Sequence, residues 1–351
     1  MQQPDESGPD EATQSDGRAI AARLDHEILG ESRELTATEL AAVADVDEEF
    51  ARNYWRALGL PIAARDRRAF TPADAEAVHE MAETARERQW DIATVSTLVR
   101  SVGHTMDRLA LWQLEALADH IMRTQGISDA AARTQTVDSL PDLMPMLQTQ
   151  LLHAWRRQLA AWASRYAIEF SDTGPQAGDA GALPMPRAVG FVDIVQFTQR
   201  TTALESRELA SFVQNFEATC RDIVTAHGGR VVKTIGDAVL FITDDAAAGA
   251  DVALALAQQW QSPQNAVDGE PLAVRISLVW GRVLSRFGDV FGPSVNLAAR
   301  LASASEPGQI LIDEATREAL QVSERFSIRQ CAVQSLPGIG EVPTWALDPA
   351  L

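Results

Sequence analysis

A segment rich in Gly, Pro and Ala, residues 171–186, divides the chain into two parts whose apolar residues repeat with different periods. Before this segment, apolar residues recur at helical spacing. After it, short runs rich in Val and Ile alternate with helical patterns, which is the order of an α/β fold. A stretch without periodicity of its own is typical of a linker. We therefore expect an all-α domain over 18–170 and an α/β domain over 187–351, with a disordered tail over 1–17.

The composition excludes several classes of protein. A formal net charge of −19 argues against general affinity for nucleic acid or anionic membranes, because both need concentrated basic charge. The two cysteines provide neither a disulfide framework nor metal-ligand spacing. No apolar run reaches the roughly 18–20 residues that cross a bilayer, and the acidic N-terminus resembles neither a signal nor a transit peptide. We expect a cytoplasmic protein.

Helix patterns in the first domain are marked by capping residues. Thr36 followed by Glu39 fits a capping box, and Pro72 after Thr71 opens another helix. A last helix is expected from Pro141 or Pro145 to 170, since proline favours a helix start over its interior. The other expected helices span 19–29, 47–58, 71–88, 91–123 and 128–137.

One part of this domain, residues 38–70, resembles the helix-turn-helix start of a MerR-type DNA reader. Its apolar residues fall in the matching order, namely Leu40, Phe50, Trp55, Leu58 and Phe70. However, residues 18–170 hold 17 Arg against 23 Asp and Glu, so a surface that grips phosphates is poorly supported. We expect a regulatory role for this domain rather than DNA binding.

In the second domain the pattern predicts a β-α-β-β-α-β core of the ferredoxin-like kind. Strands are expected over 188–195, 230–235, 238–243, 272–280, 309–312, 327–333 and 343–347. Helices are expected over 205–226, 244–260, 294–303 and 313–320.

Two aspartates mark strand ends in this core. Asp193 follows a buried run in AVGFVDIVQFT (188–198), and Asp237 lies at a hairpin tip in GRVVKTIGDAVLF (229–241). Carboxylates at the ends of adjacent buried strands repel each other unless a cation lies between them. Divalent metals take oxygen ligands and bridge to phosphate, so this pair predicts a metal site for phosphate chemistry.

Four more residues carry functional chemistry. Lys233 is the single lysine among 30 basic residues, and a compact ammonium fits pockets that a guanidinium does not. Asp289, Asn296 and Arg300 lie in FGDVFGPSVNLAARL (287–301). With Ser294 as the expected N-cap, Asn296 and Arg300 share one helix face. An amide and a guanidinium directed at one point suit a developing oxyanion.

Residues 187–347, through these motifs, resemble the catalytic domain of the class III nucleotidyl cyclases. The resemblance implies that Asp193 and Asp237 bind two Mg²⁺ or Mn²⁺ ions, helped by the Ile194 carbonyl. It also implies that Lys233 and Asp289 read the base. Lysine donates to ring N1 of adenine and aspartate accepts from its 6-amino group, so ATP is the expected substrate.

The resemblance extends to the rest of the site. Asn296 and Arg300 match positions that act on the ribose and the transition state, and Arg275 matches a phosphate-contacting arginine. Backbone N–H groups near Phe197 and Thr198 are expected to hold phosphate oxygens. Pro337 stands where many relatives carry a basic residue, so we expect the triphosphate either to be bound more weakly or to be held by another arginine.

In that family, the metal-binding and base-reading residues of one site come from opposite protomers. The resemblance therefore implies a homodimer with two composite sites, which converts ATP to cyclic AMP and pyrophosphate.

The arrangement also resembles soluble actinobacterial cyclases whose helical N-terminal domain restrains catalysis and responds to pH. Histidine titrates near neutrality, and five of the six histidines precede the linker. They are His26, His79, His104, His120 and His153.

Two alternatives stay open at the level of sequence. One is a non-catalytic dimeric regulator with a degenerate cyclase domain and the MerR-like segment. The other is a diguanylate cyclase, although its Gly-Gly-acid-acid hairpin is replaced here by Ile-Gly-Asp-Ala.

Overall fold

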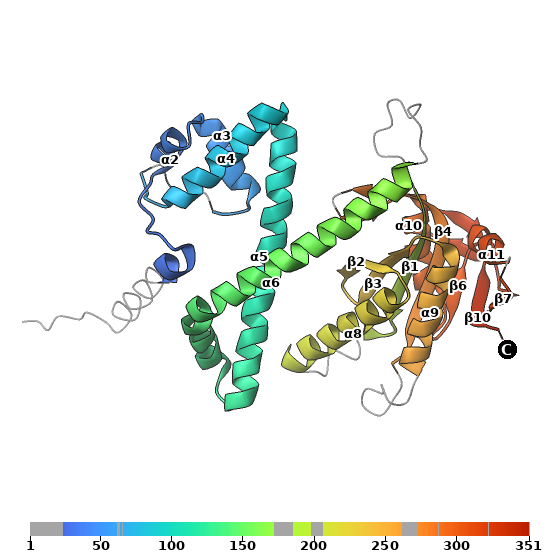
Figure 1. The fold of residues 1–351 in the computed structure, drawn as a ribbon. Helices are drawn as coiled ribbons and strands as arrows, with labels where there is room; N and C mark the ends of the chain where they lie inside the picture. Colours follow the sequence, from blue (N-terminus) through green and yellow to red (C-terminus); the bar gives the residue numbers. More distant parts are fainter. Residues whose placement is uncertain are drawn as a thin grey trace, which may run out of the picture. The chain divides into compact units, whose positions relative to one another are not determined.

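The computed structural model describes residues 24–61, 64, 66–171, 185–197, 206–261, 272–286, 288–321 and 323–350. The chain forms two compact units, residues 1–174 and 175–351. The first is helical, and the second contains a mixed sheet with helices on both faces (Figure 1). None of the helices within the described residues is long and apolar enough to cross a membrane.

The helical unit consists of short capped helices followed by two long ones. Its described helices are α2 (Ala37–Val43), α3 (Glu48–Ala57), α4 (Pro72–Arg88), α5 (Ile92–Gln125) and α6 (Asp129–Ser171). Thr36 and Glu39 form the predicted capping box of α2. Leu40, Phe70 and Val78 are central to a small core that joins α2, α3 and α4.

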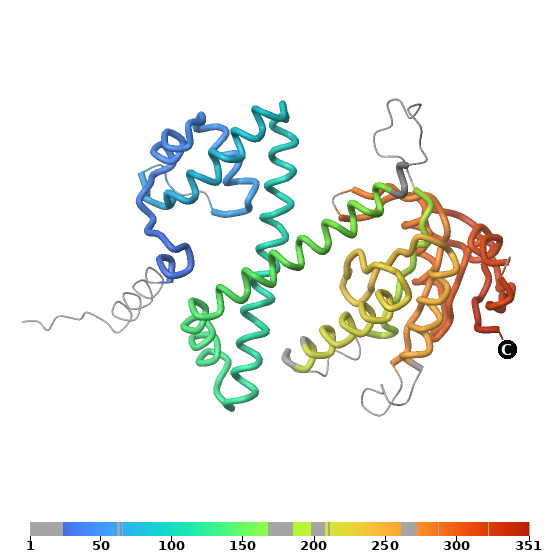
Figure 2. The backbone as a smooth tube through the Cα atoms, viewed as in Figure 1, coloured from blue at the N-terminus to red at the C-terminus, as the bar shows by residue number. Residues whose placement is uncertain are grey.

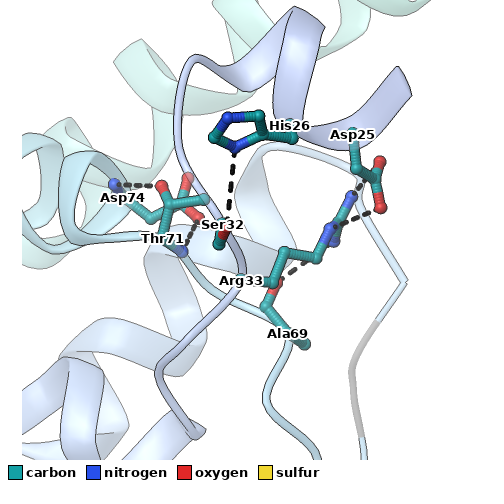
Figure 3. A network of polar contacts seen from close by, with 7 residues as sticks. All are labelled: Asp25, His26, Ser32, Arg33, Ala69, Thr71 and Asp74. Carbon is teal, nitrogen blue, oxygen red and sulfur yellow. Dashed lines mark hydrogen bonds and ion pairs between the residues drawn. The ribbon is translucent and has the colours of Figure 1, made fainter. Parts of the chain in front are cut away.

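Polar contacts tie the segment before α2 to the segment before α4 (Figure 3). The Arg33 guanidinium donates to both carboxylate oxygens of Asp25 at 3.0 Å and to the Ala69 carbonyl at 3.1 Å. Beside it, Leu35 and Phe70 form an isolated antiparallel bridge. These contacts close residues 33–70 into one small module around α2 and α3.

The two helices expected over 128–137 and from Pro141 or Pro145 to 170 are in fact a single helix, α6, with both prolines inside it. This prediction was wrong because each proline removes one backbone hydrogen bond, at a cost of about 3 kcal/mol, without compelling the helix to end. Helical sequence continues on both sides of the prolines, and α6 also packs along α5.

The α/β unit has a seven-strand path in the order β2-β3-β1-β4-β6-β10-β7. Its first part is β1 (Met185–Ile194), α8 (Ser206–Ala226), β2 (Arg230–Ile235), β3 (Ala238–Thr243), α9 (Ala246–Gln261) and β4 (Val274–Arg286). Neighbours among these four strands are antiparallel, and the order β2-β3-β1-β4 is that of a β-α-β-β-α-β core.

The second part of this unit extends the sheet beyond β4. It contains β5 (Asp289–Phe291), α10 (Pro293–Ala304), β6 (Ile310–Ile312), α11 (Glu314–Leu320), β7 (Phe326–Gln330), β8 (Gln334–Leu336), β9 (Gly340–Val342) and β10 (Trp345–Pro349). Strand β6 runs parallel to β4, and β5 folds back onto the end of β4. β4 continues to Arg286, past the expected end at 280, because it pairs there with both β1 and β5.

The two faces of the sheet are packed differently. Val192, Phe241 and Leu278 point into a core that includes Phe216 of α8 and Leu256 of α9. On the opposite face, alternate residues of the same strands, among them Val189, Leu240 and Val279, pack against Leu301 of α10. The face under α10 is the one that carries the candidate site.

Candidate active site

The two predicted metal ligands lie at one end of the central strands. Asp193 is the next-to-last residue of β1 and pairs with Ala238 of β3 on one side and Arg275 of β4 on the other. Asp237 lies immediately before Ala238, in the two-residue turn between β2 and β3. Gly236 precedes it with a φ of 63°, and a glycine at this first central position is the signature of a type II′ hairpin.

The electrostatic surroundings of Asp193 include the neighbouring carboxylate of Asp237. Burial, and then the neighbouring charge of Asp237, raise the pKa of Asp193 above that of an ordinary aspartate. The charge of Arg275 and the backbone N–H of Ile194 act in the opposite direction. A half-buried carboxylate next to a second carboxylate is a donor set that suits a hard divalent cation.

The part of the chain that the structure describes holds no cluster of three or more His, Cys, Asp or Glu side chains suited to a metal. A cation held by Asp193 and Asp237 would therefore complete its coordination with backbone, substrate or water oxygens. Ile194, the last residue of β1, follows Asp193 directly and is the nearest source of a backbone carbonyl in the sequence.

The predicted base-reading pair is formed within one chain. The Lys233 ammonium lies 2.5 Å from the Oδ2 atom of Asp289, and the Oδ1 atom of Asp289 accepts a hydrogen bond from the backbone N–H of Val290 at 2.8 Å. The side chains of Lys233 and Asp289 are 40% and 26% exposed, so both remain accessible to a ligand. Two residues that are 56 positions apart in the sequence, one on β2 and one on β5, are thus in direct contact.

A bulge in β2 places a further arginine beside this pair. The register shifts between Val231 and Lys233, so that Arg230 pairs with Ile242 and Lys233 pairs with Leu240. Leu240 and Ile242 both belong to the core under α10. The extra residue therefore directs Arg230 to the same face as Lys233. There its guanidinium donates to the Gly288 carbonyl at 3.4 Å.

Asn296 and Arg300 lie on the exposed side of α10, whereas Ala298, Leu301 and Ala302 form its buried side. The predicted N-cap, Ser294, is wrong: Gly292 is the N-cap and Pro293 follows it at the first helical position. Gly292 has a φ of 140°, which side-chain-bearing residues rarely adopt, and proline is favoured at the next position.

A cavity of about 540 Å³ reaches three of the predicted site residues, whereas Asp237, Asp289 and Arg300 are not part of its lining. Asp193, Lys233 and Asn296 contribute polar atoms to its lining, and its walls are mostly apolar. The apolar lining includes Phe191, Ile235, Leu240, Val290, Phe291 and Val295. This volume falls in the range of small-molecule and cofactor sites. A flat ring that contacts the apolar walls and accepts a hydrogen bond from Lys233 would match the chemistry of this cavity.

The remaining predicted residues, Arg275, Phe197 and Thr198, have different surroundings. Arg275 is half-buried beside Asp193, and its Nε atom is buried without a hydrogen-bond partner in the described part of the chain. The Phe197 ring stacks on Phe212 at 6.3 Å and packs against the core under α8 and α9. Thr198 lies outside the described residues.

The sequence reading missed two features of this site. One is Arg230, whose direction depends on the bulge that no residue pattern announces. The other is the apolar wall, where Ile235 and Phe291 are 50% and 48% exposed. Ile235 lies two residues before Asp237, and Phe291 lies two residues after Asp289. An exposed apolar residue this close to a site aspartate was the sequence signal that could have revealed the apolar wall.

The site and sheet agree with a known family. Residues 186–349 match the family described as Adenylate and Guanylate cyclase catalytic domain. This domain is the defining unit of the class III nucleotidyl cyclases.

Relatives extend the match across most of the chain. An adenylate cyclase of Glutamicibacter nicotianae is 39% identical over 94% of this chain and 83% of its own length. An adenylate cyclase of Streptomyces coelicolor is 37% identical over 90% of this chain and 79% of its own. A Mycobacterium tuberculosis protein named as a pH-sensitive adenylate cyclase is 30% identical over 82% of this chain and 70% of its own length. The chain therefore belongs to the class III cyclases and, within that family, to the adenylate cyclases, which argues against the non-catalytic alternative.

Proposed function

We propose that the protein converts ATP to 3′,5′-cyclic AMP and pyrophosphate at two composite sites of a homodimer, in the cytoplasm. The observation that carries this proposal is the Lys233–Asp289 pair at the cavity. An ammonium donates to ring N1 of adenine and a carboxylate accepts from the 6-amino group. Guanine has the reverse pattern at these positions, so the pair favours ATP over GTP.

Asp193 and Asp237 would hold two Mg²⁺ or Mn²⁺ ions, and the raised pKa of Asp193 supports a cation between them. When bound, such ions lower the pKa of the 3′-hydroxyl and stabilise the negative charge of the triphosphate. Arg275, beside Asp193, would contact a phosphate oxygen from the other side. The backbone near Phe197 and Thr198 would add N–H donors.

Asn296 and Arg300 would orient the ribose and stabilise charge at the α-phosphate. Both side chains are exposed on α10 within a single chain, and Arg300 does not line the cavity. A second protomer facing α10 would bring its own Asp193 and Asp237 to Asn296 and Arg300, so that each site would draw on both chains. The two-fold symmetry of a homodimer then gives two equal sites.

The direct test is to incubate the purified protein with ATP or GTP and Mn²⁺, and to identify the product. Formation of cyclic AMP from ATP in preference to cyclic GMP from GTP supports the proposal. A linear product, or equal turnover of both nucleotides, contradicts it.

The composite site has a separate test. Mixing Asp193→Ala chains with Asn296→Ala chains under subunit exchange restores activity in the heterodimer, because one of its two sites is intact. Mixing Asp193→Ala with Asp237→Ala is the matched control, since both changes fall in the same half-site and no intact site forms. Shared sites are ruled out if the control mixture is active, or if the mixture of Asp193→Ala and Asn296→Ala chains is inactive.

The helical unit would act as a regulator that responds to pH. The relative named as pH-sensitive supports this, because its match covers more of the chain than the cyclase domain alone. His79 is a candidate sensor: its Nδ1 atom lies 2.9 Å from the Ala44 carbonyl and its Nε2 atom 3.6 Å from Glu83. Protonation would strengthen the contact with Glu83. An unchanged pH–activity profile in His79→Gln would remove His79 from this role.

A further inference from the structure

A second cavity, of about 580 Å³, lies in the helical unit, where the turn before α3 meets the end of α4 and the start of α5. Figure 2 shows α4 leading directly into α5, with a reversal of direction between them. Asp45 and Asp47 line the cavity from the turn between α2 and α3, and Gln89, Trp90 and Asp91 line it from the turn between α4 and α5. The proposed cyclase reaction does not use this cavity.

The walls of this cavity are largely apolar. Ala85 and Val95 form part of its lining and belong to the small core that joins α3, α4 and α5. Closer to solvent, Trp90 is 37% exposed and Ile92 is 50% exposed. Phe50 adds a second aromatic ring to the lining. A cavity of this size with aromatic and aliphatic walls fits the body of a small organic molecule.

The charged groups of the lining determine which charge such a molecule carries. Asp45, Asp47 and Asp91 contribute three carboxylates. Arg86 contributes one guanidinium, which donates to the backbone carbonyl of Asp45 at 3.2 Å. Hydrogen bonds from the side chain and the backbone N–H of Thr94 lower the pKa of Asp91, so this carboxyl group is ionised at neutral pH. The lining is therefore electronegative, and a cation complements it.

An anion is disfavoured by the same carboxylates. The N-termini of α3 and α5 both lie at the cavity, and a helix N-terminus on its own attracts anions. Here the N-caps already carry negative charge. The Phe50 N–H donates to Oδ1 of Asp47 at 2.7 Å, and the Thr94 N–H donates to Oδ1 of Asp91 at 2.7 Å. An incoming anion would meet a carboxylate at each helix end.

We propose that this cavity binds a small organic cation, namely a primary amine with an aromatic body, at a site formed by Asp47, Asp91 and Trp90. The ammonium would donate hydrogen bonds to the carboxylates, and the ring would pack against Trp90 and Phe50. An ammonium beside an indole ring gains further from the cation–π interaction. Because the ligand would join residues at the starts of α3 and α5, its binding would stabilise the folded helical unit. This inference is independent of the proposed function.

Three probes of similar shape test the sign of the charge in the unaltered full chain. They are 2-phenylethylammonium, 2-phenylethanol and 3-phenylpropanoate, which share a ring and differ in the polar group. Ligand-observed NMR titrations at neutral pH give the dissociation constants. We expect the ammonium to bind about tenfold more tightly than the alcohol, and the carboxylate not to bind. Equal affinity for the alcohol, binding of the carboxylate, or no binding of the ammonium overturns the proposal.

A charge-removing variant places the bound probe. Asp47→Asn combined with Asp91→Asn removes both charges and retains the caps, since asparagine caps helices as well as aspartate does. We expect the dissociation constant of 2-phenylethylammonium to rise about tenfold. The control is Asp107→Asn, which leaves that constant unchanged because Asp107 is exposed further along α5 and is not part of the lining. Equal effects of the two variants would mean a response to overall charge, and they would refute the site.

Trp90→Leu tests the aromatic wall. It raises the dissociation constant of 2-phenylethylammonium about threefold through loss of the cation–π interaction. Trp112→Leu is the matched control, because Trp112 is 52% exposed on the same helix as Asp91 caps and lies outside the lining. A loss of affinity in both variants, or in neither, contradicts the assignment of the probe to this cavity.

Discussion

Lys233 of β2 and Asp289 of β5 form an ion pair with 2.5 Å between Nζ and Oδ2, in the same chain and at the edge of the candidate cavity. Without nucleotide, each group satisfies the other. Adenine would bind to this pair through complementary groups, so the contact that joins β2 to β5 would also be the one that selects the base.

The first prediction concerns base selection. Lys233→Ala lowers kcat/KM for ATP by about 10- to 150-fold, since a hydrogen bond to a charged group contributes about 1.5–3 kcal/mol. The value for GTP falls much less, because guanine presents a donor and not an acceptor at ring N1. Steady-state rates with both nucleotides check this. A loss of the same size for ATP and GTP would mean that Lys233 supports the fold instead.

The second prediction concerns Arg230, which holds the turn that carries Asp289. Arg230→Ala frees the Gly288 carbonyl and lets Asp289 move relative to Lys233. We expect KM for ATP to rise several-fold with a smaller change in kcat, and Arg230→Lys to recover part of the loss.

Arg329, an exposed arginine on β7, provides the control for Arg230. Arg329→Ala removes the same charge far from β5 in the strand order and keeps wild-type kinetics. If Arg230→Ala lowers kcat and thermal stability while KM stays constant, the positioning role is refuted.

The third prediction gives the sign of a pH effect. The charge of Arg275 lowers the pKa of Asp193, which burial and Asp237 raise. Arg275→Ala removes the lowering influence, so the pKa of Asp193 rises further and activity at acidic pH is lost at a higher pH than in the wild type. The pH profile of kcat/KM measures this. Arg275→Lys keeps a positive charge, and its acidic limb therefore stays near that of the wild type.

The fourth prediction concerns the two thiols. Burial raises the pKa of the Cys220 thiol to about 12, so at pH 8 it is protonated and unreactive in the folded protein. Cys331 is only partly buried. A chromogenic thiol reagent should modify one cysteine per chain in the native state and two after denaturation. Rapid modification of both in native protein would show that the core around Cys220 opens.

The sequence was most informative where local patterns decide structure. The strand Arg230–Ile235 has the predicted bounds, and the helix Pro72–Arg88 begins one residue after its predicted start, because a turn glycine and the capping Thr71 mark them. The three-residue strands β5, β8 and β9 were missed because such short runs show no alternation.

Features that depend on tertiary contacts could not be predicted from residue patterns. The two prolines inside α6 and the cap at Gly292 depend on which competing local preference the surroundings favour. The candidate site residues came from motifs, and the structure brings Asp193, Lys233 and Asn296 to one cavity. The bulge at Val232 that turns Arg230 toward Gly288 is a property of strand pairing and leaves no mark in composition.

The partial exposure of Lys233 has a practical outcome, because the chain contains no other lysine. Any reagent that acylates side-chain amines can modify this protein at a single ε-amino group, and that group lines the candidate cavity. Acylation there would both abolish the ammonium and fill the space beside it. Protection by nucleotide would then report directly on pocket occupancy, without a label or an engineered residue.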